Sequence, residues 1–515
     1  MMRALATVGL WTMLSRVLGF VRDIMIAAFL GAGPVAEAFV IAFALPNMFR
    51  RFFAEGAFNM AFIPLFSKKL EAGDDPDGFA RDALTGLGLV LVLFTLVAML
   101  AMPWLVLAMA SGFAGDERFD LAVTFGRIAF PYILFISLAA LASGVLNANR
   151  HFVAAAAAPV LLNALFIGAL LLAGALGWPA GLTLAWTVPL AGLAQLALVW
   201  EAARRVGFRL LPRRPRLTPE LKRLAIIAAP AALAGGVVQV NLLVGRQVAS
   251  YFEGAAAWLY YADRLYQLPL GVVGIAIGVV LLPDLSRRLQ AGDEAGSQHA
   301  FSRATEVSMA LTLPAAVALL IIPLPLISVL FERGAFTRDD ALPTALACAV
   351  YGAGLPAFVL QKVLQPLYFA REDTRSPFRF ALVALGINAV LAIGLAPLVG
   401  FLAAAIGATL AGWGMAWLLW RGTRAMGPSA ALDDRVRERI PRIIISSAIM
   451  GGVLLVGAWL LEGALVLPGW RYVALAALIL AGVLSYAAAA QATGAFQLSE
   501  LRAGLRRSAP PDPTQ

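Results

Sequence analysis

Cysteine is almost absent from this chain, which has 515 residues and a single cysteine, Cys348. No disulfide can therefore form within the chain, and no cysteine-based metal site can be assembled. Histidine is nearly as rare, and His151 and His299 fall in or near polar stretches, where solvated side chains are expected rather than metal ligands. The sequence contains no nucleophile, metal or nucleotide motif. We therefore expect no cofactor, no metal and no enzymatic activity.

Charged residues are scarce as well, at 14%, whereas hydrophobic residues make up 61%. This balance excludes a soluble globular domain and a disordered chain. About fourteen apolar segments reach the roughly 20 residues that cross about 30 Å of hydrocarbon. They cover residues 4–31, 35–66, 84–110, 121–146, 152–176, 181–203, 220–249, 255–285, 304–331, 340–370, 377–399, 402–421, 441–461 and 470–492. The sequence predicts an all-α polytopic membrane protein with about 14 transmembrane helices, the first too long and too charged for a cleaved signal peptide.

Lysine and arginine gather in alternate loops, which predicts the orientation of the chain. The rich loops hold Lys68, Lys69, Arg81, Arg150, the basic residues of 204–223, Arg287, Arg288, Arg303, Arg371, Arg375, Arg379, the run from Arg421 to Arg442, and Arg502, Arg506 and Arg507. The opposite loops hold only Arg118, Arg333, Arg338 and Arg471. We therefore expect a multi-pass protein with both termini in the cytoplasm.

A basic, proline-containing segment follows the sixth span and divides the chain into two halves. FIPLFSKKL at 62–70 and LLPDLSRRL at 281–289 share proline, serine, a basic pair and leucine at equal spacing, each in the second span of its half. This favours a parallel repeat, although any helix with a positive cytoplasmic end can carry a similar pattern. We predict an N-terminal six-helix lobe at 1–203, a basic cytoplasmic linker at 204–223, a C-terminal six-helix lobe at 224–424, two additional transmembrane helices at 425–492 and a cytoplasmic tail at 493–515.

The stretch from Ser15 to Phe58 places charged residues where lipid hydrocarbon is expected. They are Arg16, Arg22, Asp23, Glu37, Arg50, Arg51 and Glu55, and the second half adds Arg246, Asp263, Arg264 and Lys362. An arginine at the bilayer centre costs about 2.5 to 3.5 kcal/mol on insertion scales, so such a cluster persists where it lines a wet cavity or is paired. We therefore predict a cationic chamber that faces an anionic cargo. The alternative is interhelical ion pairs or snorkelling side chains, above all for Arg51, Arg127 and Arg246.

Helix periodicity makes two local predictions about these charges. Arg16 and Asp23 are seven residues apart and share a helix face, whereas Arg22 points elsewhere and needs another partner. Asp263 and Arg264 are adjacent and point about 100° apart, so we expect that they do not neutralise each other.

Four segments resemble the signature segments of the lipid II flippase family, called MurJ or MviN. They are SRVLGFVRD at 15–23, LPNMFRRFFAEGAF at 45–58, YADRLYQLPLGVVGIAIGVVLLPDLSR at 261–287 and LQPLYFAREDTRSP at 364–377. The likeness covers nearly the whole chain and points to the multidrug/oligosaccharidyl-lipid/polysaccharide exporter superfamily. It implies two six-helix lobes around a central cavity, plus two helices that extend a hydrophobic groove.

The activity implied by this resemblance is the movement of undecaprenyl-diphosphate-linked disaccharide-peptide, lipid II, from the inner to the outer leaflet of the bacterial cytoplasmic (inner) membrane by alternating access, for peptidoglycan synthesis. The expected partners are this cargo and membrane lipid, without nucleic acid. Cell-wall synthesis proteins are candidate protein partners, and the chain is expected to act as a monomer.

The resemblance also implies site residues. Family residues important for transport match Arg16, Arg22, Arg50 and Arg264, and an acidic family position falls on Glu37. The expected substrate-binding set adds their charged neighbours Asp23, Arg51, Glu55 and Asp263. A lysine that some relatives carry before the LPN motif is Ala44 here, so it cannot be required. Some members bind sodium, but Asn388 is the only obvious polar residue of its span, and we predict no sodium site.

Other classes stay open. A drug or cation antiporter of the same superfamily would carry buried acidic residues in excess, whereas the predicted chamber is cationic. Another polyprenyl-linked oligosaccharide flippase would share the predicted fold. A membrane glycosyltransferase needs clustered carboxylates or histidines in a loop, and the acidic loop at Asp74, Asp75 and Asp77 is short and typical of a solvated turn. The last two spans either face a polyprenyl tail or pack only against lipid.

Overall fold

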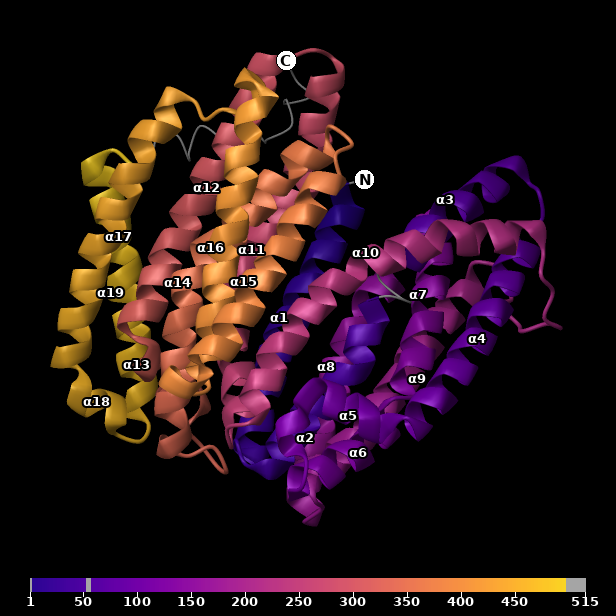
Figure 1. Ribbon diagram of the computed structural model, residues 1–515, viewed down its shortest axis with the longest axis horizontal. Coiled ribbons are helices and arrows are strands. Elements are labelled where there is room, and N and C mark those ends of the chain that lie inside the picture. Colours follow the sequence, from indigo (N-terminus) through magenta and orange to yellow (C-terminus); the bar gives the residue numbers. More distant parts are fainter. Residues whose placement is uncertain (1, 52–56, 497–515) are drawn as a thin grey trace, which may run out of the picture. The chain divides into compact units, whose positions relative to one another are not determined.

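The computed structural model describes residues 2–51 and 57–496, with side chains throughout except at 2–6, 57–60, 229–238 and 272–280. The regular structure of these residues is helical (Figure 1). The helices are α1 (Met2–Leu30), α2 (Pro34–Arg50), α3 (Ala57–Ala72), α4 (Pro76–Leu100), α5 (Met102–Ala110), η2 (Ser111–Phe113), α6 (Glu117–Ala129), α7 (Tyr132–Ala148), α8 (Val153–Leu176), α9 (Ala180–Arg205), α10 (Pro219–Ser250), α11 (Ala255–Gln290), α12 (Glu294–Ile321), α13 (Pro323–Phe331), α14 (Arg338–Phe369), α15 (Arg375–Val399), α16 (Leu402–Thr423), η3 (Arg424–Met426), η4 (Pro428–Ala430), α17 (Asp434–Leu460), α18 (Glu462–Val466) and α19 (Trp470–Thr493).

Among the described residues, the predicted membrane spans coincide with helices. Within the described residues, ten stretches of helix are long and apolar enough to cross a membrane. The remaining predicted spans lie in α1, in α2 with α3, in α10 and in α11, which carry most of the predicted membrane charges. Three of the predicted spans are each built from two consecutive helices, α4 with α5, α6 with α7, and α12 with α13. The chain is an all-α, polytopic membrane protein, as predicted.

Helix ends follow the local sequence. The side chains of Asp116, Thr218 and Asp433 accept hydrogen bonds from first-turn backbone amides of α6, α10 and α17. This satisfies donors that have no partner inside the helix. At the other end, Gly177 and Gly494 stop α8 and α19 in the left-handed conformation, which glycine adopts without a steric penalty.

The chain divides into two compact units, Met1–Tyr261 with Arg333–Asp340, and Ala262–Glu332 with Ala341–Gln515. The first boundary falls inside α11, so α10 belongs to the first unit. The boundary between the two compact units therefore differs from the predicted boundary between lobes, which lies in the linker 204–223. The predicted lobes at 1–203 and 224–424 stay a prediction.

In the first unit, α1 packs against α8, α2 packs against α6, and α9 packs against both α7 and α8. Helix α10 lies against α3 and α5. Near its end, the Gln247 amide donates to the carbonyls of Leu107 and Ala108 at 2.8 and 2.7 Å and accepts from the Ser111 amide at 2.9 Å. These bonds hold the last turn of α10 to the end of α5.

The segment between α13 and α14 belongs to the first unit and docks on the end of α1. The Ala335 amide donates to the Ala28 carbonyl at 2.7 Å. Helix α11 contacts the same end of α1, because Tyr261 Oη donates to the Gly31 carbonyl, also at 2.7 Å. A Cβ on Gly334, whose φ is +59°, would lie 2.2 Å from the Ala28 oxygen, so the close approach requires glycine at this position.

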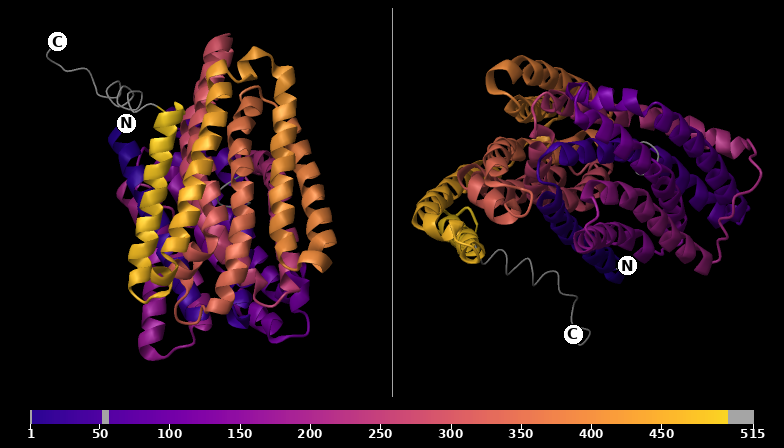
Figure 2. Two further views of the ribbon diagram at one scale, coloured as in Figure 1. Left: turned by 90° about the vertical axis from the view of Figure 1, so that its left-hand side faces the viewer. Right: turned by 90° about the horizontal axis from the view of Figure 1, so that it is seen from below.

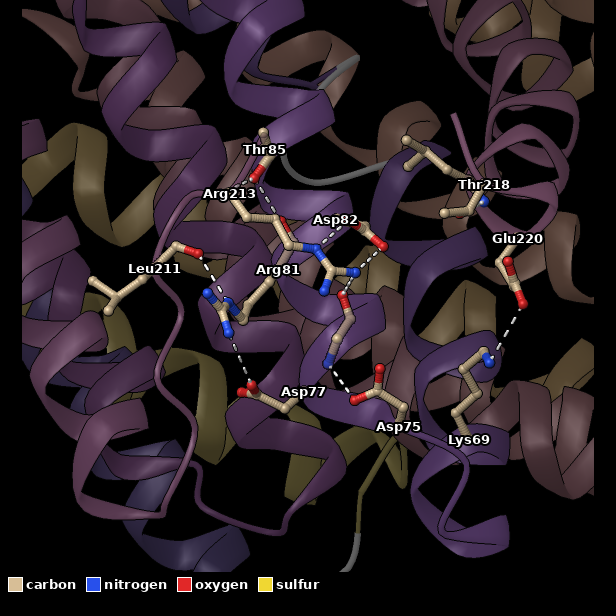
Figure 3. A network of polar contacts seen from close by, with 12 residues as sticks. Lys69, Asp75, Asp77, Arg81, Asp82, Thr85, Leu211, Arg213, Thr218 and Glu220 are labelled. Carbon is tan, nitrogen blue, oxygen red and sulfur yellow. Dashed lines mark hydrogen bonds and ion pairs between the residues drawn. The ribbon is translucent and has the colours of Figure 1, made fainter. Parts of the chain in front are cut away.

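The connection between α9 and α10, residues 206–218, lies inside the predicted linker 204–223 and is held against α4 (Figure 3). The Arg213 guanidinium forms an ion pair with the buried carboxylate of Asp82, and this hydrogen bonding raises the Arg213 pKa. The Arg213 amide also donates to Thr85 Oγ1 at 3.0 Å. The linker is therefore an ordered strap along the start of α4.

In the second unit, α15 pairs with α16, and α17 packs against α12 and α19 (Figure 2). The α17–α19 pair contributes Met450, Leu454 and Leu478 to one buried apolar cluster. Its polar end is tied to α12, because Glu306, which is buried, accepts a hydrogen bond from Arg439 of α17 at 2.5 Å.

Candidate substrate site

The guanidinium of Arg22, in the second half of α1, is held on three sides. Its Nε and Nη2 donate to Asp23 Oδ1 at 3.0 and 2.8 Å. Its Nη1 donates to Asn163 Oδ1 of α8 at 2.9 Å, and the Phe166 ring covers the planar group at 5.6 Å from its centroid. Arg22 and Asp23 are 9% and 2% exposed, so this is a buried, paired cation rather than a side chain that snorkels to the surface.

Asp23 connects this cluster to α11. The Tyr260 hydroxyl donates to Asp23 Oδ1 at 3.0 Å, the same oxygen that accepts from Arg22. Three helices distant in sequence, α1, α8 and α11, therefore supply one polar cluster inside the apolar first unit. Buried polar groups need such partners, because an unsatisfied one costs roughly 1 to 3 kcal/mol.

Arg16 lies on the same helix, beside a cavity of about 480 Å³ formed by α1, the end of α7 and the start of α8. Thr12, Ser15 and Asn147 supply polar atoms to its wall, and apolar side chains including Phe152 supply the rest. The Nε of Arg16 is buried and has no hydrogen-bond partner among the described residues. The cavity therefore offers a cationic wall together with neutral hydrogen-bonding groups.

Glu37 lies in a separate cluster at the start of α2 and is completely buried. Its Oε2 accepts from Arg118 Nη1 at 3.1 Å, and its Oε1 accepts from the Ala256 amide at 3.0 Å. Arg118 also donates to Asp116 and stacks on the Phe113 ring at 4.5 Å. Glu37 thus joins the starts of α2, α6 and α11, where a carboxylate at a helix N-terminus is favourable.

Asp116 stands outside the membrane-spanning part of α6. Its side-chain hydrogen bond to Arg118 holds the Asp116 pKa below its ordinary value of 3.8. The carboxylate is therefore ionised at neutral pH and contributes to the orientation of Arg118, which in turn reaches the buried Glu37.

The other predicted residues of the first unit lie at or beyond the end of α2. Arg50 ends α2 and is half-buried, and Arg51 follows it and is exposed. Glu55 lies outside the described residues. The structure therefore brings Arg22 and Asp23 into direct contact, with Arg16 on the same helix, and places Glu37 in a second cluster.

Asp263 and Arg264 lie in α11, within the second unit. Arg264 Nη2 pairs with Asp263 Oδ2 at 3.2 Å, and Gln267, one turn later, donates to the same oxygen. The predicted convergence of Arg16, Arg22, Arg50 and Arg264 on one chamber involves both units and stays a prediction.

One prediction about charge pairing is wrong, because Arg264 pairs with its neighbour Asp263. The expectation that Arg22 finds a partner elsewhere is confirmed by its bond to Asn163 of α8, although Arg22 also pairs with its neighbour Asp23. Adjacent Cβ atoms do point about 100° apart, but a long arginine side chain bends across that angle. Helix periodicity predicts the direction of the Cα–Cβ bond, but it does not fix the position of the charged group at the end of a long side chain.

The predicted site residues did not include Asn163, Tyr260 or Arg118. Asn163 had a detectable signal, since it is the one polar side chain in the otherwise apolar sequence of α8. Tyr260 adjoins a signature segment. Arg118 was assigned to a loop because it stands beside Asp116 and Glu117 in a polar stretch, yet it is 8% exposed.

Sequence comparisons match this chain to known proteins over most of its length. A family model described as lipid II flippase MurJ matches residues 26–474. A probable lipid II flippase MurJ from Rhizobium meliloti (strain 1021) is 45% identical over 525 aligned positions, which cover 99% of this chain and 97% of that relative. The lipid II flippase MurJ from Burkholderia cenocepacia (strain J2315) is 38% identical over 407 positions, covering 77% and 79% of the two chains.

Solved structures share the fold. A lipid II flippase MurJ in an inward closed conformation superposes with a TM-score of 0.79 at 24% identity, covering 94% of this chain and 98% of that one. An inward-facing multidrug resistance MATE transporter of the MOP superfamily gives a TM-score of 0.68 at 14% identity, covering 82% and 98%. The sequence matches extend over almost the full length and include the helices that carry Arg22, Glu37 and Arg264. This chain therefore belongs to the MurJ family of lipid II flippases.

Proposed function

We propose that this protein moves lipid II from the inner to the outer leaflet of the bacterial cytoplasmic membrane, and that buried arginines hold the anionic head group during the crossing. The observation that carries the proposal is Arg22, a buried and oriented guanidinium on the long helix α1, in a chain that aligns with a probable lipid II flippase over nearly its whole length. No covalent step is needed, so the protein acts as a transporter and not as an enzyme.

Arginine suits this cargo for a physical reason. A diphosphate has several acceptor oxygens in a fixed geometry, and the planar guanidinium can donate to two of them in parallel, which the point charge of lysine cannot do. The lipid tail can stay in the bilayer while only the head group crosses the polar interior. The charge of the head group must then be matched by protein groups, because bulk water is largely absent there.

The cavity beside Arg16 supports this assignment. Its volume of about 480 Å³ falls within the range of roughly 300 to 1,000 Å³ that is typical of small-molecule pockets. We assign it to part of the head group, with Arg16 facing a phosphate or carboxylate and Ser15, Thr12 and Asn147 available to sugar hydroxyl or amide groups. Arg50, Arg51 and Arg264 are assigned to the same cargo path, with Glu55 beside them in sequence.

The acidic residues of the predicted set receive a different role. Asp23 is bonded to Arg22, Asp263 to Arg264, and Glu37 to Arg118 and a backbone amide. Since each carboxylate already accepts a hydrogen bond from an arginine, we propose that these acids orient the arginines and do not contact the cargo.

The remaining assignments follow the loop charges and the family. Both termini and the 204–223 linker are placed in the cytoplasm, and two six-helix lobes alternate access to the central path. The α17–α19 pair is assigned to the polyprenyl tail. Membrane lipid surrounds the monomer, and cell-wall synthesis proteins are the expected protein partners.

Purified protein in vesicles that contain labelled lipid II in one leaflet tests the proposal. Arg22→Ala and Arg264→Ala should abolish appearance of the label in the other leaflet, while Arg22→Lys should retain part of the rate because charge survives without planar geometry. Arg127→Ala is the matched control, since Arg127 is an exposed arginine that donates to the Met99 carbonyl. The proposal fails if both alanine variants, folded and inserted, transport as well as the control.

A further inference from the structure

Asn163 is a polar residue in an otherwise apolar helix. It is the one polar side chain of α8, in the sequence VAAAAAPVLLNALFIGALLLAGAL, and it is 5% exposed. A buried amide is costly unless its hydrogen bonds are made. Its position on an apolar helix therefore calls for partners on a neighbouring helix, and α1 supplies them.

The amide of Asn163 bonds to two points of α1. Its Oδ1 accepts from Arg22 Nη1 at 2.9 Å, and its Nδ2 donates to the Ser15 carbonyl at 2.8 Å. Ser15 and Arg22 are seven residues apart, which is about two helical turns and places them on one face of α1. One side chain thus bridges the guanidinium of Arg22 and the backbone next to Arg16.

Two further residues lie where α8 approaches α1. Gly19 lies between Ser15 and Arg22, and a Cβ there would lie 3.4 Å from Asn163 Nδ2, an ordinary van der Waals distance. Phe166 lies three residues beyond Asn163 on the same face of α8, and its ring covers the Arg22 guanidinium. Helix α8 therefore contacts the guanidinium on one edge through Asn163 and on its face through Phe166.

We propose that Asn163 is a positioning residue for cargo binding, which sets the plane of the Arg22 guanidinium so that it meets a diphosphate in the bidentate geometry. Asp23 alone fixes one edge of that group and leaves it free to swing about the shared carboxylate. A second contact on another edge, from a different helix, removes that rotation. This inference rests on the proposed function, because it assigns Asn163 a role through Arg22.

Binding of undecaprenyl diphosphate to the detergent-solubilised full chain tests the inference, with the thermal unfolding midpoint measured without ligand. Loss of a hydrogen bond to a charged group corresponds to about a 10- to 100-fold change in an equilibrium constant. We expect Asn163→Ala to weaken binding by that factor. The matched control is Gln195→Ala, because buried Gln195 also donates to a backbone carbonyl at 2.8 Å, that of Ala158 in α8, without touching Arg22.

A double-mutant cycle separates positioning from general stability. In an Arg22→Ala background, Asn163→Ala should cause no further loss of affinity, although it can still lower the unfolding midpoint. An equal loss in both backgrounds, or an affinity loss in Gln195→Ala as large as that in Asn163→Ala, overturns the inference. If Arg22→Ala itself binds like the unmodified protein, the proposed function fails instead.

If Asn163→Ala does not fold, Phe166→Leu provides a second test of how α8 positions the Arg22 guanidinium. Phe166→Leu keeps an apolar side chain between α1 and α8 but removes the ring from the guanidinium. We expect a several-fold loss of affinity that disappears in the Arg22→Ala background, since a cation–π contact is weaker than a charged hydrogen bond. Unchanged affinity in Phe166→Leu would then refute the positioning role of α8.

Discussion

Substituting Gly334 by alanine should release the loop of residues 333–337, between α13 and α14, from the end of α1. At φ +59° the added Cβ would lie 2.2 Å from the Ala28 carbonyl oxygen, well inside any real contact distance. The obstacle is backbone, which cannot rotate away as a side chain can. The loop must therefore lift, and the bond from the Ala335 amide to the same oxygen must break.

The magnitude follows from two contributions. A left-handed conformation costs a non-glycine residue about 1 to 2 kcal/mol, and loss of one hydrogen bond costs about 0.5 to 1.5 kcal/mol. Their sum, roughly 1.5 to 3.5 kcal/mol, corresponds to a shift of about 10- to 300-fold in the docking equilibrium at about 1.4 kcal/mol per factor of ten. The clash itself adds to this value.

Hydrogen exchange at the Ala335 amide is the direct assay. This amide donates at 2.7 Å in the docked loop, so its exchange rate reports how often the loop opens. We expect exchange to accelerate by at least about 10-fold in Gly334→Ala. Gly115→Ala is the control, because Gly115 also has a positive φ, +88°, but nothing lies within 4 Å of its Cβ position. Equal protection of Ala335 in Gly334→Ala and the unmodified protein would refute the reasoning.

Three further predictions concern charges. Glu37→Ala removes the ion pair of Glu37 with Arg118, which keeps Asp116, and leaves the Ala256 amide without its acceptor, so stability should fall by roughly 1 to 3 kcal/mol, seen as a lower thermal midpoint in detergent; an unchanged midpoint would contradict the role of Glu37 in joining these helices. Asp82→Ala should free the strap, so that protease cleaves within residues 206–218 faster than in the unmodified protein, and equal cleavage rates count against strap docking. Because its pKa is lowered in the folded protein, the Asp116 contribution to stability is complete above its ordinary pKa of 3.8 and is lost as the pH falls through the lower folded value. Asp116→Asn should therefore lose less stability on acidification than the unmodified protein, and identical acid sensitivity would argue against this contribution.

Local sequence was enough to predict the helices. The span at 377–399 and the helix Arg375–Val399 differ by two residues at one end, because a hydrocarbon core selects apolar runs of a set length. The signature segments likewise identified the family before any contact was known, since they are contiguous in the chain. The buried charges Arg22 and Asp23 could also be found, because a charge in an apolar run is conspicuous by itself.

The partners of those charges were decided by tertiary structure. Asn163 lies 141 residues from Arg22, and Ala256 lies 219 residues from Glu37, so no local pattern connects them. Even between neighbours, the flexible arginine side chain reached Asp23 and Asp263 against the direction of its Cβ. The sequence by itself determined the membrane class, the positions of the spans and the family, because hydrophobic transfer acts on each segment separately. Only the packed structure decided which polar groups meet, because a hydrogen bond requires two atoms within about 3 Å of each other whatever their distance along the chain.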